Sequence, residues 1–213
     1  MTRIRSNTLL ATACSAAFLL FGVPFAYATT INVTINSTAL NGVTTVSAFD
    51  FIDGGPPDNT VMLSALTSNG TQDSTSTTGN VTGTGPWTFS DSGGSFFNEL
   101  LVTFNPMGTS LQFSFTTTDN APDPGSSPDA FSMYALDSTA TFPLITTDDP
   151  TGANALFLFN LGQGADGLTV YSVDQPGFSV SASSPPTPAP EPRILSLLLA
   201  AAIALFARGR FAR

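Results

Sequence analysis

Apolar and polar residues alternate along most of the chain between positions 29 and 183. In the first such stretch, the apolar Ile31, Val33 and Ile35 enclose the polar Asn32 and Thr34. A period of two places successive side chains on opposite faces, which is typical of a β-strand with one buried face. The same pattern recurs at 43–51, 61–67, 111–115, 131–136, 168–172 and 178–180.

Turn-forming residues separate these segments. Clusters of Gly, Pro, Asn, Asp and Ser occur at 53–57, 69–70, 92–94 and 166–167. Short strands divided by turns at such intervals favour a sandwich or a barrel. The sequence therefore predicts an all-β domain of roughly ten strands over residues 29–183, folded as an antiparallel, jelly-roll-like β-sandwich.

Two segments have patterns of their own. Residues 155–159 are apolar on both faces, which predicts a central strand. Residues 95–104 fit two periods at once, because their apolar positions match both a helix and a strand. A short helical turn that continues into a strand would satisfy both patterns, and we expect that structure there.

The N-terminal segment has the layout of a signal peptide. Arg3 and Arg5 precede an apolar run at 9–23, and Ala26 and Ala28 supply the small residues of a cleavage site. We therefore expect residues 1–28 to be removed during export.

Cleavage there leaves Thr29 as the first residue of the mature protein. Cys14, the one cysteine of the chain, lies inside the leader. The mature protein is thus expected to have neither a thiol nor a disulfide, and a domain of this size can rely on its core alone.

The C-terminal segment begins with a proline-rich spacer and continues with an apolar run. The spacer spans 184–193, contains Pro190, Glu191 and Pro192, and is expected to be extended. The apolar run at 194–207 has 14 residues. As a helix it would be roughly 21 Å long, shorter than the ~30 Å hydrocarbon core of a bilayer.

A basic tail at 208–213 completes this segment, and its arginines should keep that end in the cytoplasm. The Pro-Glu-Pro motif, the apolar run and the arginines together resemble the PEP-CTERM sorting signal of exported bacterial proteins. The resemblance implies a membrane exosortase that recognises the motif and removes the tail. Arg193 departs from the family pattern, in which a small or hydroxyl residue usually follows the motif. The alternative is a generic tail anchor behind a proline-rich spacer.

Charge is divided in the same way. All six basic residues lie in the two terminal segments, so residues 29–192 contain no Lys, Arg or His and all 15 acidic residues. Such a surface repels nucleic acid and anionic lipid, which both bind through Lys and Arg. The missing residue types also exclude a Ser-His or Cys-His nucleophile, a Schiff base and a histidine metal site.

The domain itself resembles a group of PEP-CTERM proteins with a β-sandwich body. The resemblance is carried by INVTINSTALNG, by FFNELLVTFNPMGTSLQFSF and by FSMYALDSTATFPLITTDDPTGANALFLFNL. It covers nearly the whole mature chain and implies a sandwich fold and export. The group has no assigned activity, so the resemblance implies no chemistry.

Three kinds of candidate site remain. Trp87, Tyr134 and Tyr171 are candidate sugar contacts, because an aromatic ring can stack on a pyranose face; the alternative for Trp87 is a core or edge anchor. Glu99 is a candidate acid of a carboxylate pair, and its alternative is an ordinary surface glutamate.

Calcium is the third possibility, because it binds through six to eight oxygen ligands and the domain is rich in carboxylates. The candidate ligands crowd two loops: Asp119, Asp123, Asp129, Asp148 and Asp149. The alternative is that these aspartates stabilise turns through local backbone hydrogen bonds. No other cofactor is expected.

Together these features predict an exported, non-catalytic protein that is anchored briefly by its tail and then released to or beyond the cell surface. Its expected role is structural or adhesive in an extracellular polysaccharide matrix or biofilm. Its expected partners are the secretion machinery, an exosortase and a polysaccharide. The alternative is a carbohydrate-binding module with structural calcium.

Overall fold

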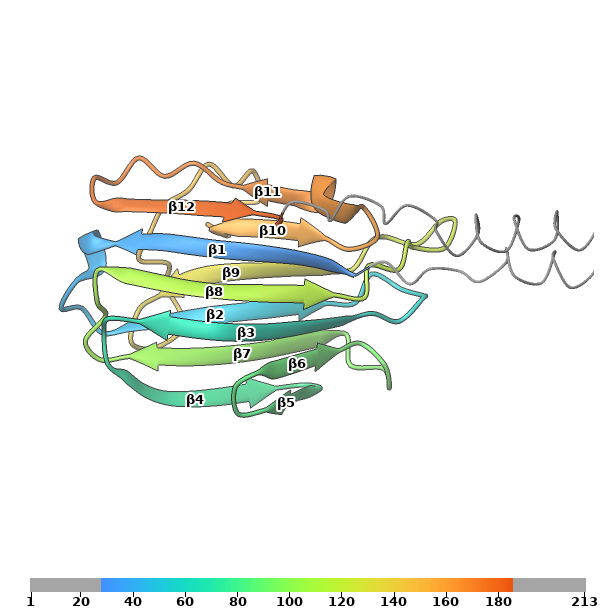
Figure 1. Cartoon of the computed structure of the whole chain (residues 1–213), viewed down its shortest axis with the longest axis horizontal. Coiled ribbons are helices and arrows are strands. Elements are labelled where there is room, and N and C mark those ends of the chain that lie inside the picture. The colour runs from blue at the N-terminus through green and yellow to red at the C-terminus, as the bar shows by residue number, and fades with distance from the viewer. Residues whose placement is uncertain (1–27, 186–213) are drawn as a thin grey trace, which may run out of the picture. The chain divides into compact units, whose positions relative to one another are not determined.

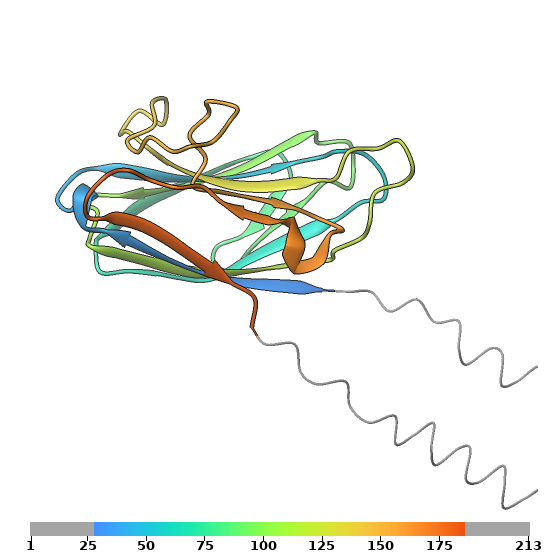
Figure 2. The same ribbon diagram turned by 90° about the horizontal axis from the view of Figure 1, so that it is seen from above.

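The structure, a computed structural model, describes residues 28–185 and consists of two antiparallel six-stranded sheets packed face to face (Figures 1 and 2). The first sheet has the order β12-β1-β8-β3-β6-β5, and the second β11-β10-β9-β2-β7-β4. The strands are β1 (Thr29–Ser37), β2 (Thr45–Ile52), β3 (Thr60–Ser68), β4 (Gln72–Thr78), β5 (Val81–Gly83), β6 (Trp87–Ser90), β7 (Phe97–Phe104), β8 (Ser110–Thr117), β9 (Ala130–Leu136), β10 (Phe157–Asn160), β11 (Leu168–Val170) and β12 (Phe178–Ser183). Two short 3-10 helices, η1 (Thr38–Leu40) and η2 (Gly164–Gly167), lie in the connections.

The core between the sheets is built from the alternating apolar positions. Ile31, Val33 and Ile35 of β1 are fully buried, whereas the polar residues between them are exposed. Phenylalanine rings from both sheets meet in the centre. The ring of Phe115 lies parallel to that of Phe157 at 5.6 Å between centroids, and 5.0 Å from that of Phe131. The predicted all-β sandwich is therefore confirmed for residues 29–183.

Two elements differ from expectation. β4 and β5 were not predicted. β4 is a fully exposed edge strand of Ser, Thr, Gln and Asp, so it has no alternation of apolar and polar residues that could indicate a strand. The helical turn expected in 95–104 is wrong. β7 is extended from its first residue, pairs with β2 along its length and turns Leu100, Val102 and Phe104 into the core. Phe96, which a helix would have buried, is 67% exposed.

The segment at 155–159 largely follows its prediction. β10 lies between β9 and β11, so it is an interior strand. Phe157 and Phe159 face the core, and Leu156, just before the strand, is fully buried. Residues 1–27 of the leader, residues 186–193 of the spacer, the apolar run at 194–207 and the basic tail lie outside the described residues. Within 28–185, no helix is long and apolar enough to cross a membrane.

Both ends of the domain lie at the same end of the first sheet. β1 and β12 are antiparallel neighbours, with Asn32 opposite Ser183, so β1 begins where β12 ends. Thr29 is also opposite Thr117, the last residue of β8. We call this the Thr29 end of the sandwich. The connections β2–β3, β6–β7, β8–β9 and β10–β11 lie at this end, as the strand registers require.

Candidate functional site

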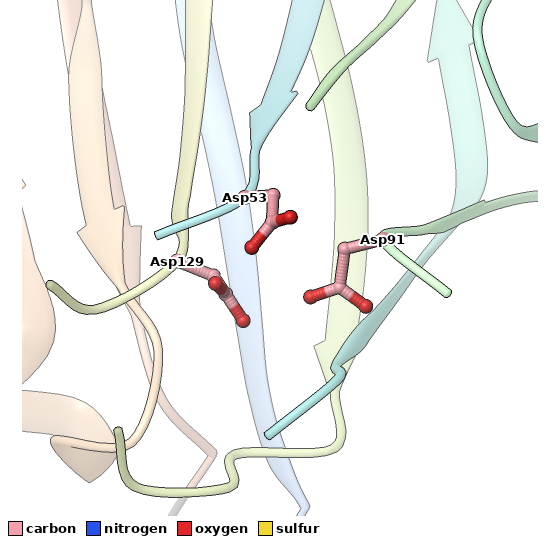
Figure 3. A group of neighbouring side chains, drawn as sticks. All are labelled: Asp53, Asp91 and Asp129. Carbon is pink, nitrogen blue, oxygen red and sulfur yellow. The ribbon is translucent and has the colours of Figure 1, made fainter. Parts of the chain in front are cut away.

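Three aspartates from separate connections gather at the Thr29 end. Asp53 follows β2, Asp91 follows β6, and Asp129 precedes β9. Carboxylate oxygens of the three residues lie within 4.8 Å of one another. Figure 3 shows the three side chains turned toward a common space, with Asp53 and Asp129 side by side and Asp91 facing them. We call this group the carboxylate cluster.

The strand period explains why these carboxylates point inward. Asp53 stands two residues beyond Phe51, Asp91 two residues beyond Phe89, and Asp129 two residues before Phe131. The three phenylalanines are fully buried, so the next position of the same period also faces the interior. Asp91 and Asp129 are only 4% and 2% exposed. The cluster thus continues the inward face of both sheets with acids in place of apolar residues.

Asn59 holds two of the three carboxylates. Its backbone N–H donates to both oxygens of Asp91, at 2.8 and 2.9 Å. Its side-chain amide donates to Oδ2 of Asp129 at 2.6 Å. The amide oxygen of Asn59 in turn accepts hydrogen bonds from the Thr118 hydroxyl and the Asn120 N–H, both at 2.9 Å. Asn59 is therefore held through its backbone N–H and through both polar atoms of its side-chain amide, and it links the two sheets.

The connection after β2 holds the other side of the cluster. The N–H of Gly54 donates to Oδ1 of Asp129 at 2.8 Å, and the N–H of Gly55 donates to Oδ1 of Asp53 at 2.6 Å. A Cβ atom at Gly54 would overlap the carbonyl oxygens of Ser127 and Pro128. A glycine is needed at position 54 because the two connections approach each other so closely.

The surroundings of the cluster disfavour the ionised form of its carboxylates. Burial first, and then the neighbouring Asp129 carboxylate, raise the pKa of Asp91 to about 7, in spite of the Asn59 N–H, which lowers it. No basic residue occurs between 29 and 192. The charge of the cluster must therefore be balanced by a proton or by a cation from solution.

A divalent cation fits the donor set. The three carboxylates offer only oxygen ligands, which calcium prefers over nitrogen or sulfur. Thr117, at the same end of the first sheet, is 1% exposed, and its hydroxyl has no hydrogen-bond partner among the described residues. It is the last residue of β8 and stands opposite Val61, two residues from Asn59. The side chain of Thr117 is therefore on the inward face of β8, as those of Phe113 and Phe115 are.

Only one of the calcium candidates taken from the sequence belongs to this cluster, namely Asp129. Asp119 accepts hydrogen bonds from the Thr29 hydroxyl and the Gly162 N–H, each at 2.6 Å. Asp123 is exposed in the same connection as Asp129.

The other two candidates, Asp148 and Asp149, lie in the connections between β9 and β10. Asp148 accepts a hydrogen bond from the Ser172 N–H at 2.6 Å. Asp149 accepts hydrogen bonds from the N–H groups of Thr151 and Ala155. Burial would raise the pKa of Asp149, but these hydrogen bonds outweigh it and lower the pKa. Asp149 thus has the local, turn-stabilising contacts of the alternative interpretation, whereas Asp148 joins this connection to the segment after β11.

Asp53 and Asp91 were missed because they are not in an aspartate-rich loop. The sequence does contain a signal that could have identified them. Each is an acidic residue two positions beyond the last buried phenylalanine of a strand, where the period of two predicts another inward side chain. That signal identifies an inward carboxylate, but it does not identify its neighbours, which the sheet registers determine.

The three aromatic candidates lie on different sheets. Trp87, in β6 of the first sheet, is 6% exposed and packs in the hydrophobic core. Part of its side chain lines a half-open pocket of about 370 Å³ together with Ser64, Gln72 and Thr84. Tyr134, in β9 of the second sheet, is half-buried, and its oxygen accepts a hydrogen bond from the Ser132 hydroxyl at 3.3 Å.

Tyr171 follows β11, and its N–H donates to the Leu156 carbonyl at 3.1 Å. Tyr134 and Tyr171 therefore belong to the second sheet and Trp87 to the first. The structure does not bring the three rings into one row.

Glu99 has a carboxylate partner. It lies in β7 directly opposite Asp50 of β2, and Asp50 is also opposite Ser132 of β9. Asp50 alternates with the core residues Phe49 and Phe51, so this pair is on the outer face of the second sheet. Burial, and after it the Glu99 carboxylate, raise the pKa of Asp50 to about 7. Burial also raises the pKa of Glu99.

Comparison with known proteins adds no neighbour: no family model, no curated protein and no solved structure matches the chain.

Proposed function

We propose that the chain is an exported, non-catalytic β-sandwich protein, structural or adhesive in an extracellular polysaccharide matrix, sorted by its PEP-CTERM-like tail. The observation that carries the proposal is the position of the two domain ends. Because β1 begins beside the end of β12, the leader and the tail connect to the same end of one sandwich. Removal of both segments would then change the body at the Thr29 end and leave the opposite end untouched.

The composition of the body supports export to a polysaccharide matrix. Residues 29–192 have no cysteine and no basic residue, so the domain needs no redox partner and does not attract nucleic acid.

The strand order supports a jelly-roll-like arrangement. The first four strands alternate between the two sheets, and the neighbouring strands are β1-β8-β3-β6 in one sheet and β2-β7-β4 in the other. Jelly rolls are common among lectin and capsid domains, an association of fold and not of chemistry.

The experiment that tests this proposal follows the tail in a host that carries an exosortase. Glu191 is the one carboxylate in the spacer, and it is the recognition residue that the resemblance implies. Glu191→Gln should leave the protein in the inner-membrane fraction, whereas wild type and the control Thr187→Ala are released. In a host without the sorting enzyme, wild type should behave like Glu191→Gln. Equal release of wild type and Glu191→Gln would contradict exosortase sorting and leave the generic anchor.

A second candidate, a carbohydrate-binding module with structural calcium, is favoured by the carboxylate cluster. Two of its three carboxylates are buried without a cationic side chain nearby, and a calcium ion would balance their charge. Binding to the folded state alone would raise stability with calcium concentration.

Thermal unfolding with calcium and with chelator tests this candidate. Calcium should raise the melting temperature of wild type and of Asp73→Asn, a control on the exposed strand β4. It should not raise that of Asp91→Asn. Because Asp91→Asn also removes a buried acid, that variant should be at least as stable as wild type in chelator at pH 7. A calcium response that is equal in all three proteins would place the ion elsewhere.

A further inference from the structure

The first residue of the expected mature protein already has a specific partner. Thr29 begins β1, and its hydroxyl donates a hydrogen bond to Oδ2 of Asp119 at 2.6 Å. The other oxygen of that carboxylate, Oδ1, accepts a hydrogen bond from the Gly162 N–H at 2.6 Å. Asp119 is therefore held between the start of β1 and the connection after β10. Its position is fixed by the fold and not by a flexible loop end.

The surroundings of this contact are acidic. Aspartates in the connections of the Thr29 end include those of the carboxylate cluster and, in addition, Asp58, Asp119, Asp123 and Asp166. No basic side chain exists between 29 and 192 to balance them. The only group of the mature domain that can carry a positive charge at neutral pH is the α-amino group at its own N-terminus.

We infer that the α-ammonium group of Thr29, released when the leader is removed, is a structural part of the folded domain and that Asp119 is its counter-ion. This inference rests on the proposed export, because it requires cleavage between Ala28 and Thr29. In that hydrolysis the amide C–N bond breaks, the hydroxide of water goes to the Ala28 carbonyl carbon and its proton goes to the Thr29 nitrogen. The new carboxylic acid of Ala28 then ionises, and the Thr29 amine takes up a proton in the same net amount, so the products are a carboxylate and an ammonium group. A neutral amide is replaced by an ammonium group beside a carboxylate.

The distance follows from the geometry of a threonine residue. Its nitrogen and its Oγ1 are separated by three covalent bonds and lie ~3 Å apart. Since Oγ1 is 2.6 Å from Oδ2 of Asp119, the ammonium group lies within ~6 Å of that carboxylate. Thr29 and Asp119 are both partly buried, so the pair is screened less than two fully exposed charges.

The chain itself permits a clean test. Residues 29–183 contain every strand and every core residue found within 28–185, so we take this segment as the folding unit. It has no lysine, so its α-amino group is the only amine, and an amine-directed acetylating reagent removes only that charge. The segment is made as a fusion that is cut directly before Thr29. Free and acetylated forms are then compared by urea unfolding, followed by the fluorescence of Trp87, the single tryptophan.

The inference predicts a charge effect that depends on Asp119. Acetylation should lower the folding equilibrium constant of wild type about two- to five-fold at low salt, the range of partly exposed ion pairs. The loss should shrink toward zero in 1 M NaCl. It should be the same in the control Asp123→Asn, an exposed acid of the same connection, and absent in Asp119→Asn.

Two results would overturn the inference. Equal losses in wild type and Asp119→Asn would mean that the ammonium group is not paired with Asp119. If Asp119→Asn does not fold, the salt series on wild type decides alone, and no difference between its free and acetylated forms at low salt is the contrary outcome. N-terminal sequencing of the exported protein is a separate check, because a start other than Thr29 contradicts the cleavage and leaves the unfolding data unaffected.

Discussion

Asp50 offers a direct test of how the second sheet tolerates an acid on its outer face. One of its oxygens, Oδ1, is buried and has no hydrogen-bond partner among residues 28–185. Its neighbours in the sheet are Glu99 on β7 and Ser132 on β9, with Tyr134 following on the same face. Burial, and then Glu99, raise the pKa of Asp50 from 3.8 to about 7. Asp50→Asn keeps the shape of the side chain and removes its ionisation.

The sign of the effect follows from proton binding. The unfolded chain releases the proton of Asp50 near pH 4, whereas the folded domain keeps it until about pH 7. The contribution of Asp50 to stability is therefore complete below pH 4 and is lost as the pH rises to 7. A pKa change of this size corresponds to ~4 kcal/mol, and screening of a partly exposed group reduces this to ~2 kcal/mol.

The assay is thermal unfolding of residues 29–183 at pH 4, 5.5 and 7 in chelator. Wild type should lose stability across this range, and Asp50→Asn should lose ~2 kcal/mol less, or ~4–8 °C in melting temperature for a domain of this size. A smaller fall should remain in Asp50→Asn, because the pKa of Asp91 is also raised to about 7. Asp73→Asn, on the exposed strand β4, should behave like wild type. Parallel curves for wild type and Asp50→Asn would refute the reasoning.

Three further predictions concern the fold. Residues 29–183 alone should give a far-UV spectrum of β-structure and one cooperative melt, since the whole core cluster lies within them; a helical spectrum or a gradual melt would contradict this. Phe115→Ala should destabilise the domain by ~3–5 kcal/mol in urea unfolding, because Phe115 is fully buried against rings of the second sheet. The control Phe142→Ala, at a site that is 67% exposed, should change stability by less than ~0.5 kcal/mol. Ala65 has a φ of 52° where β3 departs from regular pairing with β8. Ala65→Gly should therefore be neutral or stabilising by up to ~1 kcal/mol in the same assay. A clear loss of stability would show instead that the methyl group of Ala65 packs favourably.

The sequence predicted the strands whose pattern records burial. β1 and β8 alternate cleanly because one face of each is in the core and the other in water. β4 leaves no such record, since both of its faces are exposed and its place in the sheet depends on pairing with β7. The start of β7 was misinterpreted for a related reason. Phe96 and Phe97 are apolar but not in the core, and together with Leu100, Leu101 and Phe104 they produce the spacing of an apolar helix face.

The carboxylate cluster shows the limit of local patterns more sharply. Each aspartate could be recognised as inward from its own strand, as Asp53 beyond Phe51 illustrates. Its neighbours could not, because Asp91 belongs to the first sheet and Asp129 to the second. Only the packing of the sheets brings them within 4.8 Å. The aspartate-rich loops attracted attention by composition, but most of their carboxylates are occupied by nearby N–H groups.

The pairing of β1 with β12 determines how the domain responds to mechanical load. Their hydrogen bonds run across the strands, and the two free ends lie side by side. A pull that separates Thr29 from Ser183 loads these bonds one after another, so the strands unzip at low force. A pull between Ser183 and the opposite end of the sandwich runs along β12 and loads its bonds to β1 together, in shear. A body attached through its C-terminal end and gripped at its far end would therefore bear tension in its stronger direction.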